Sequence, residues 1–145
     1  PNKKVITMSN DNNSFIQINL DEVPDTIPQL EAGTYTFLVD KAYIKPSKNL
    51  EKPSNNLVLE MHVEDESNPS HGRKMTHYNN LGTSDFAKVG LRRIVKAAGL
   101  IPSANGLNPL DLVGKFMKAV VVQQPYTDPT TGEAGVRANI KDFLF

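Results

Sequence analysis

Lysine and tyrosine alternate over Lys41, Tyr43 and Lys45, so two cations and one aromatic ring share a face if this segment is extended. Ammonium groups neutralise phosphates, and a flat ring offers a surface on which a nucleobase can stack. This pattern favours contact with a single nucleic-acid strand. The alternative is a tyrosine that covers the protein surface between two solvated lysines.

Two later segments carry further side chains of the same kinds. The first segment is Arg73–Leu81, which begins with the cation Arg73. Alternation at the period of a strand puts its Lys74 and Tyr78 on one side. Tyr78 is the second stacking residue that we expect, with a place in the core as its alternative. The second segment is Val136–Phe143, in which the same alternation points Arg137 and Lys141 away from the apolar positions.

Two long stretches, 46–56 and 126–135, are rich in turn-forming residues and too polar to bury. They carry Lys48 and Tyr126, and a tyrosine in a polar loop has no core to fill. We therefore expect both loops to flank the binding surface. The full set of predicted nucleic-acid-binding residues is Lys41, Tyr43, Lys45, Lys48, Arg73, Lys74, Tyr78, Tyr126, Arg137 and Lys141.

Known catalytic and metal-binding motifs are missing from the sequence. The three histidines fit no compact ligand spacing, and there is no phosphate-binding loop, nucleophile elbow or dinucleotide fingerprint. The sequence has no cysteine, which excludes disulfides and thiolate chemistry. We predict a protein that is not an enzyme and that needs no cofactor or metal.

Apolar periodicity predicts the elements that must position these side chains. In the first predicted strand the inward phase slips near Val39–Lys41, as a β-bulge would produce. Five strands with one helix between the third and the fourth follow the order of the OB-fold, a partly open all-β barrel. The predicted strands are Thr34–Lys45, Leu57–Val63, Arg73–Leu81, Lys115–Gln124 and Val136–Phe143.

The predicted helix runs from Asp85 to about Ala98, with Ser84 as its N-cap and Gly99 at its end. Its basic side chains suggest a second nucleic-acid contact or a dock for an acidic partner, although such charges more often form a solvated face. The cations are Lys88, Arg92, Arg93 and Lys96, and the predicted buried stripe is Phe86, Leu91, Ile94, Val95 and Ala98.

Residues 1–31 are expected to form an extended N-terminal arm, and residues 32–145 the single OB-fold domain. Within the arm, Phe15–Leu20 is predicted as a short strand that pairs with a barrel edge or with a second subunit. The arm carries two lysines and five acidic side chains, a net charge of −3 that the remaining residues balance with +3. This neutrality does not by itself favour nucleic acid, because most binding domains are basic.

An ordered set of short motifs resembles a family of small phage single-stranded DNA-binding proteins. The resemblance covers roughly residues 15–143 and lies in EAGTYTFLVDKAYIKPSKN, LVLEMHVED, GRKMTHYNNLGT, KAAGL, DLVGKF and ANIKDF. It implies an OB-fold that binds single-stranded DNA with little sequence preference and without catalysis. Such proteins often end in an acidic tail, whereas this sequence ends at Asp142–Phe145, so either the tail is missing from this version or partner recruitment works differently.

The resemblance further implies work in phage DNA replication or recombination, with phage or host replication and recombination proteins as partners. No apolar run is long enough for a membrane span, so we expect the cytoplasm of the infected bacterium as the location. Two other functions stay open. One is a protein-interaction or virion-associated module with an OB-like barrel, and the other is an oligosaccharide-binding barrel.

Overall fold

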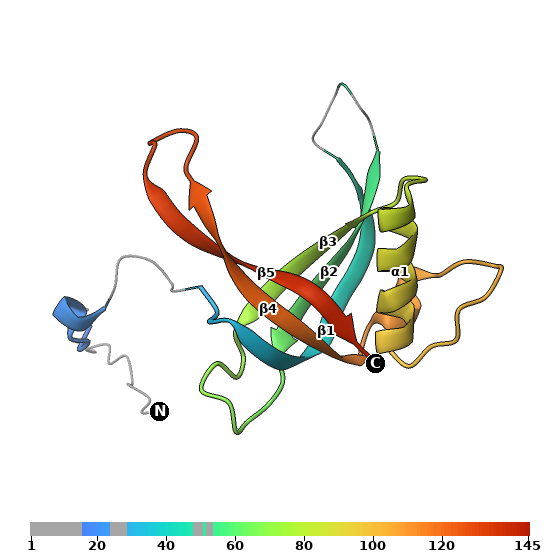
Figure 1. The fold of residues 1–145 in the computed structure, drawn as a ribbon. Coiled ribbons are helices and arrows are strands. Elements are labelled where there is room, and N and C mark those ends of the chain that lie inside the picture. Colours follow the sequence, from blue (N-terminus) through green and yellow to red (C-terminus); the bar gives the residue numbers. More distant parts are fainter. Residues whose placement is uncertain (1–15, 24–28, 48–50, 52–53) are drawn as a thin grey trace.

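The computed structural model describes residues 16–23, 29–47, 51 and 54–145, and shows one curved antiparallel sheet with a helix beside it (Figure 1). The strand order is β3-β2-β1-β4-β5. Five strands and the intervening helix confirm the predicted order and the largely β class. The elements are η1 (Leu20–Glu22), β1 (Gly33–Pro46), β2 (Asn55–Val63), β3 (Lys74–Asn80), α1 (Asp85–Ala97), η2 (Pro109–Leu112), β4 (Phe116–Thr127) and β5 (Ala134–Leu144).

Strand β1 bends at a bulge and serves both halves of the sheet. Its first half pairs with β4 and its longer second part with β2. The register with β2 shifts between Val39 and Lys41, which leaves Asp40 as the extra residue. The bulge predicted at this place is confirmed, and it lets Ala42 take the inward position after Val39.

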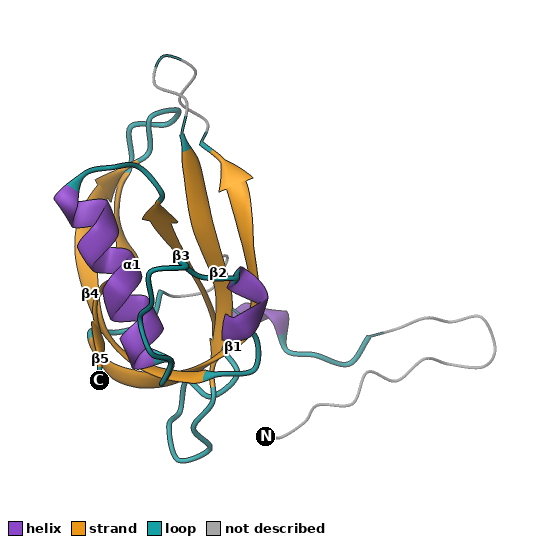
Figure 2. Cartoon of the chain, turned by 90° about the vertical axis from the view of Figure 1, so that its right-hand side faces the viewer, coloured by secondary structure: helices purple, strands orange, loops and turns teal. Residues whose placement is uncertain are grey.

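The sheet curves round (Figure 2). Alternate side chains of the strands fill the inside of this curve. Tyr35 is among them, and its hydroxyl donates to the carbonyl of Glu31 at 2.7 Å. Burial of these side chains is the main stabilising contribution. The fully buried large side chains of the core include Phe37, Val39, Leu57, Leu59, Met61, Val63, Ile94, Leu112, Met117 and Val121.

The two edge strands, β3 and β5, face each other without forming a ladder in the described sheet. Side chains bridge them: the His77 ring meets Phe143 edge to face, with ring centroids 5.0 Å apart. Nearby, the Gln29 side chain accepts from the amide of Ala138 at 3.0 Å, and Leu30 is buried in the core. We call this line between β3 and β5 the seam.

A second register shift, between Val120 and Val121, lies where β4 pairs with β5. Because Val120 pairs with Asp142 and Val121 with Ile140, Lys141 is the extra residue on β5. The shift lets Ala138 and Phe143 both point inward and leaves Lys141 exposed beside the seam.

Helix α1 starts where predicted, with the Ser84 hydroxyl accepting from the amide of Ala87 at 3.1 Å. Its buried stripe begins at Ala87 and includes Ile94 and Val95. The prediction that Phe86 belongs to this stripe is wrong, because Phe86 is 93% exposed. It precedes Ala87 by one residue and is therefore turned about 100° away from the stripe.

The N-terminal arm differs from its prediction in local structure. Residues 16–19 form no regular element, and Leu20 opens the 3-10 turn η1, so the predicted strand is wrong for the part that is described. The side chain of Asn19 accepts from the amide of Asp21 at 3.1 Å and caps this turn. No helix in the described part of the chain combines the length and apolar character needed to cross a bilayer.

Candidate nucleic-acid interface

Two tyrosines and a valine form a row across β1, β2 and β3. Tyr43 pairs with Val58, and Val58 pairs with Tyr78. Val58 is only 1% exposed although it lies outside the core cluster, because its neighbours in the row shield it. Tyr78 is 56% exposed, so much of its surface faces solvent. We call these three residues the tyrosine row.

Tyr43 is fixed within the row by its hydroxyl, which donates to the Glu60 carboxylate at 2.5 Å. This hydrogen bond is the main reason why the pKa of Tyr43 lies above its usual value, with burial and the Glu60 charge adding to it. Tyr43 therefore stays neutral at physiological pH. Its ring is half-buried beside Tyr78, which is the more accessible of the two rings.

Lysines lie on both sides of the tyrosine row on the same outer face. Lys41 and Lys45 occupy the outward positions of β1 before and after Tyr43, and Lys74 on β3 pairs with His62 of β2. All three lysines are exposed. The face therefore presents cations at spacings that could follow a strand while bases contact the row.

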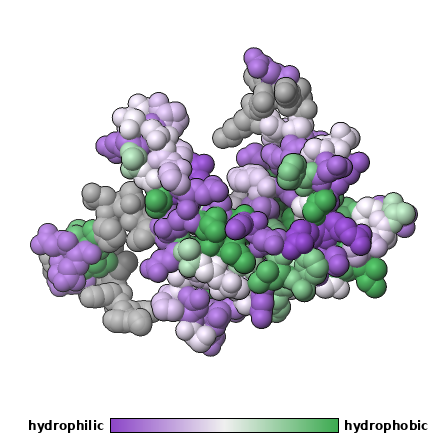
Figure 3. All heavy atoms as spheres, viewed as in Figure 1, coloured by the Kyte–Doolittle hydropathy of each residue, from purple (hydrophilic) through white to green (hydrophobic). Residues whose placement is uncertain are grey.

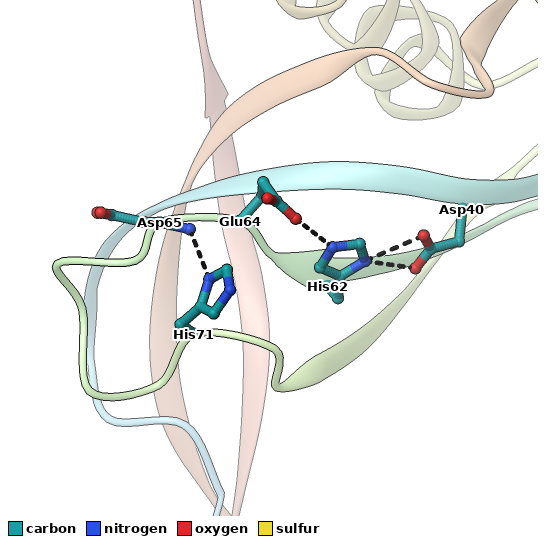
Figure 4. Close-up of polar contacts among 5 residues, drawn as sticks. All are labelled: Asp40, His62, Glu64, Asp65 and His71. Atoms are coloured by element: carbon teal, nitrogen blue, oxygen red, sulfur yellow. Dashed lines mark hydrogen bonds and ion pairs between the residues drawn. The ribbon is translucent and has the colours of Figure 1, made fainter. Parts of the chain in front are cut away.

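Carboxylates share this face, and more of them gather there than the alternation of the strands predicts. His62 Nδ1 lies 2.8 Å from Asp40 Oδ2, and its Nε2 lies 2.6 Å from Glu64 Oε1 (Figure 4). Glu60 lies between this group and the row, paired with Lys41. Asp40 is the extra residue of the β1 bulge, so alternation alone does not predict on which face of the sheet its side chain lies.

The two carboxylates raise the pKa of His62, with the hydrogen bond to Asp40 as the larger cause and that to Glu64 as the next. A protonated imidazole then offsets part of the negative charge on the face. Nothing here resembles a metal centre: the described residues contain no group of three or more suitable ligands.

Three hollows in the surface are each lined by Tyr78, by His77 or by both. The first, about 310 Å³, is lined by Lys45, Pro46, Asn56 and Tyr78. The second, about 350 Å³, lies across the seam and is lined by Thr76, His77, Tyr78, Gln124, Asn139 and Ile140. The third, about 250 Å³, shares His77 and Ile140 with the second and also touches Asn79, Phe86, Val89, Gly90, Arg93, Lys141, Asp142 and Phe143.

The shared lining residues place these hollows next to one another, and we call the series of hollows the seam path. It runs from Lys45 over Tyr78 and His77 to Phe86. Burial lowers the pKa of His77 to about 4, so this side chain is neutral along the path. Phe86 is the aromatic residue that the predicted set lacks. The signal that could have found it is its position: Phe86 directly precedes Ala87, where the buried stripe of the helix begins, and therefore lies off that stripe.

The β4–β5 hairpin holds two predicted residues in a different arrangement. Tyr126 was expected in a loop, but it lies on β4 and pairs with Gly135. The strands continue farther because the turn closes later, where the Asp128 side chain accepts from the amide of Thr130 at 2.8 Å. The Arg137 guanidinium carbon lies 4.1 Å from the centre of the Tyr126 ring.

The remaining predicted residues are scattered. Arg73 lies just before β3, where a hollow of about 420 Å³ separates the start of that strand from Gln29 and Ala138. Lys141 lines the third hollow at the bulge of β5. Lys48 falls outside the described residues. The structure therefore brings Lys41, Tyr43, Lys45, Lys74 and Tyr78 together, with Arg73 and Lys141 near the seam and Tyr126 and Arg137 on the hairpin.

The surface is hollowed between two projections (Figure 3). One projection is the β4–β5 hairpin, and the other is the end of the β1–β2 pair (Figure 1). The predicted loops 46–56 and 126–135 begin at these projections, and part of the first loop falls outside the described residues. That both loops flank a binding surface stays a prediction.

Comparison with known proteins yields no matching family model and no matching curated protein. The function proposed below therefore rests on the arrangement of residues in this chain.

Proposed function

We propose that this chain is a single-stranded DNA-binding protein with an OB-fold, and that DNA crosses the outer face of β1, β2 and β3. The observation that carries the proposal is the exposed ring of Tyr78, which lines two hollows and has lysines on the same face of the sheet. Bases would stack on Tyr78 while Lys41, Lys45 and Lys74 contact phosphates.

The topology supports the OB-fold part of the proposal. A bent first strand shared by both halves of the sheet, a helix between β3 and β4, and a seam between β3 and β5 are features of this barrel. In OB-folds the face of the second and third strands, with the loops after β1 and β4, holds the ligand. The tyrosine row lies on that face.

The charges on the face indicate how the binding energy is divided. Three lysines face Asp40, Glu60 and Glu64, so electrostatic attraction is weaker than on a basic groove. Stacking contributes about 1–3 kcal/mol per base and does not depend on net charge. We therefore infer that stacking carries most of the affinity, and that base identity matters little because every base has a flat face.

A titration of the full chain with fluorescent oligo(dT), at several salt concentrations, tests this function. The matched control is a duplex of the same length. Three lysine–phosphate contacts predict that log K falls with log[salt] with a slope of about −2. Binding to duplex as tight as to oligo(dT), or no binding to either, would rule out the proposal.

A second candidate is a protein-interaction module, as a zero net charge and the carboxylates beside the tyrosine row would favour. The same titration separates the two functions. A protein partner bound through Tyr78 would leave oligonucleotide affinity absent at every salt concentration.

By resemblance to the phage proteins, we further propose a role in phage DNA replication or recombination in the bacterial cytoplasm, without enzymatic activity. Coating of single strands by this protein would keep them open for other enzymes. Removal of hairpins from a folded oligonucleotide, followed by its fluorescence, is the expected activity.

A further inference from the structure

A groove lies on the side of α1 that faces the segment after the helix. It has a volume of about 200 Å³, and its floor is apolar: Leu91 and Val95 from the helix, and Pro102 and Leu107 from the following segment. Lys88 and Arg92 form its rim. We call it the α1 groove. It belongs neither to the tyrosine row nor to the seam path.

The charge around the α1 groove is of one sign. No acidic residue occurs between Phe86 and Leu110 in the sequence. The helix carries four cations, of which Arg93 is already paired with Asp142 at 2.7 Å. Lys88 and Arg92 are both exposed on the rim. An apolar floor with a cationic rim fits a segment that joins apolar and acidic side chains.

The N-terminal arm of this chain has that composition. Ile16, Leu20 and Val23 are 52%, 72% and 53% exposed, which is unusual for three large apolar residues so close together. Asp21 and Glu22 lie between them and are also exposed.

Hydrogen bonds do not tie this segment to the body. The bonds found for residues 16–23 within the described chain all close inside the segment, as in the donation from the Val23 amide to the Leu20 carbonyl at 3.3 Å. The apolar side chains of the arm are therefore available to another surface.

The arm and the α1 groove of one chain lie on opposite sides of the sheet. Figure 1 shows η1 beyond β1 and β4, far from α1, and Figure 2 shows α1 in front with η1 behind the sheet. This placement favours a groove on another molecule as the site that receives the arm. Reciprocal exchange of two arms would give a closed twofold dimer with two such contacts.

We propose that residues 16–23 of one copy bind in the α1 groove of a second copy. Leu20 and Val23 would cover the apolar floor, while Asp21 and Glu22 pair with Lys88 and Arg92 on the rim. This contact assembles the protein without using the proposed DNA-binding face, so a dimer would leave both tyrosine rows accessible.

Sedimentation of the full chain without nucleic acid, over a wide concentration range, tests the dimer. We expect a monomer–dimer equilibrium. The double substitution Lys88→Glu with Arg92→Glu, or Asp21→Lys with Glu22→Lys, should raise the dimer dissociation constant roughly tenfold or more, because attraction becomes repulsion. Lys118→Glu on β4 is the control, since it makes the same charge change per residue on an exposed site outside the groove.

Restoration of the dimer is the decisive result. A chain that carries both double substitutions has a basic arm and an acidic groove, so it should associate about as well as the parent. A parent that stays monomeric at all concentrations overturns the proposal. So does a dimer that neither substitution weakens, or one that the combined exchange fails to restore.

Cross-linking shows which molecule supplies the groove. The sequence has no cysteine, so Gln17→Cys and Ser103→Cys introduce a single pair of thiols, one on the arm and one at the groove. In a mixture of isotopically light and heavy chains, cross-links between the two masses are expected. Cross-links confined to one mass would show that the arm binds its own groove and would contradict the proposal, as would the absence of any product.

Discussion

The tyrosine row and the tip of the β4–β5 hairpin each combine tyrosine with cations, yet they differ in what the ring can do. On the row, Tyr78 is 56% exposed. Lys41 and Lys45 each lie two residues from Tyr43 along β1, and Lys74 lies four residues from Tyr78 along β3. On the hairpin, the Arg137 guanidinium lies over the Tyr126 ring at 4.1 Å. A cation–π contact already occupies that face.

The difference shows that residue types alone do not define a stacking site. A base needs the face of a ring, and a cation placed over that face competes with it. On the tyrosine row the cations are spaced for phosphates, and on the hairpin the cation is held by the ring. We therefore expect binding to depend strongly on Tyr78 and weakly on Tyr126.

Tyr78→Ala should show the largest effect. Loss of one stacked base costs about 1–3 kcal/mol, so affinity for oligo(dT) should fall about 5-fold to more than 100-fold. Tyr78→Phe should retain most of the affinity, because the ring face makes the contact. The melting temperature should change little, since Tyr78 lies outside the core cluster.

Tyr35→Ala is the matched control for that result. Tyr35 is 8% exposed and hydrogen-bonded to Glu31, so its truncation should destabilise the fold by ~3 kcal/mol or more. Denaturant unfolding of both variants separates the two roles. If Tyr78→Ala destabilised the protein as much as Tyr35→Ala does, Tyr78 would be a structural residue.

Phe86→Ala should have the next largest effect if DNA follows the seam path. One stacking contact at the far end of the path predicts a loss of about fivefold, seen only with oligonucleotides long enough to reach from Tyr78. Titrations with a short and a long oligo(dT) would show this. An equal loss with both lengths would contradict the assigned path.

The pH dependence should be smaller and should depend on His62. Its pKa is raised above 6.5 in the folded state, so the stabilisation from Asp40 and Glu64 is complete below about pH 6.5. That contribution is lost as the pH rises through the raised value. DNA affinity should fall over the same range, because the carboxylates lose their compensating charge. In His62→Gln both dependences should flatten; steep curves in that variant would assign them to another group.

Tyr126→Ala should have the smallest effect, a change of less than about twofold in oligo(dT) affinity. Arg137 covers its ring and would remain as a free cation in the variant. A loss as large as that of Tyr78→Ala would show that DNA displaces Arg137 and binds on the hairpin.

Much of the fold could be predicted because the strands alternate clearly. The phase slip at Val39–Lys41 indicated the β1 bulge, and Ser84 with Gly99 marked the ends of α1. Both signals are local in the sequence. They also put Tyr35 in the core and Tyr43 on the outer face, as the structure has them.

The rest depends on contacts that local patterns do not contain. Phe86 was assigned to the core because it is apolar, but its exposure follows from where the helical stripe begins. Tyr126 was assigned to a loop because its surroundings are polar, yet the hairpin ladder continues through it. The gathering of Asp40 and Glu64 around His62 joins three positions through a bulge and a strand end, which periodicity cannot show.

Photo-cross-linking tests the central claim most directly. An oligonucleotide that carries 5-iodouracil attaches to aromatic side chains on which the base stacks, and mass spectrometry of the peptides identifies them. We predict that the main product is at Tyr78, with a lesser one at Phe86 for long oligonucleotides, and that Tyr78→Ala removes the first. A main product at Tyr126, or a product at Phe86 that exceeds the one at Tyr78 in the parent chain, would contradict binding across β1, β2 and β3.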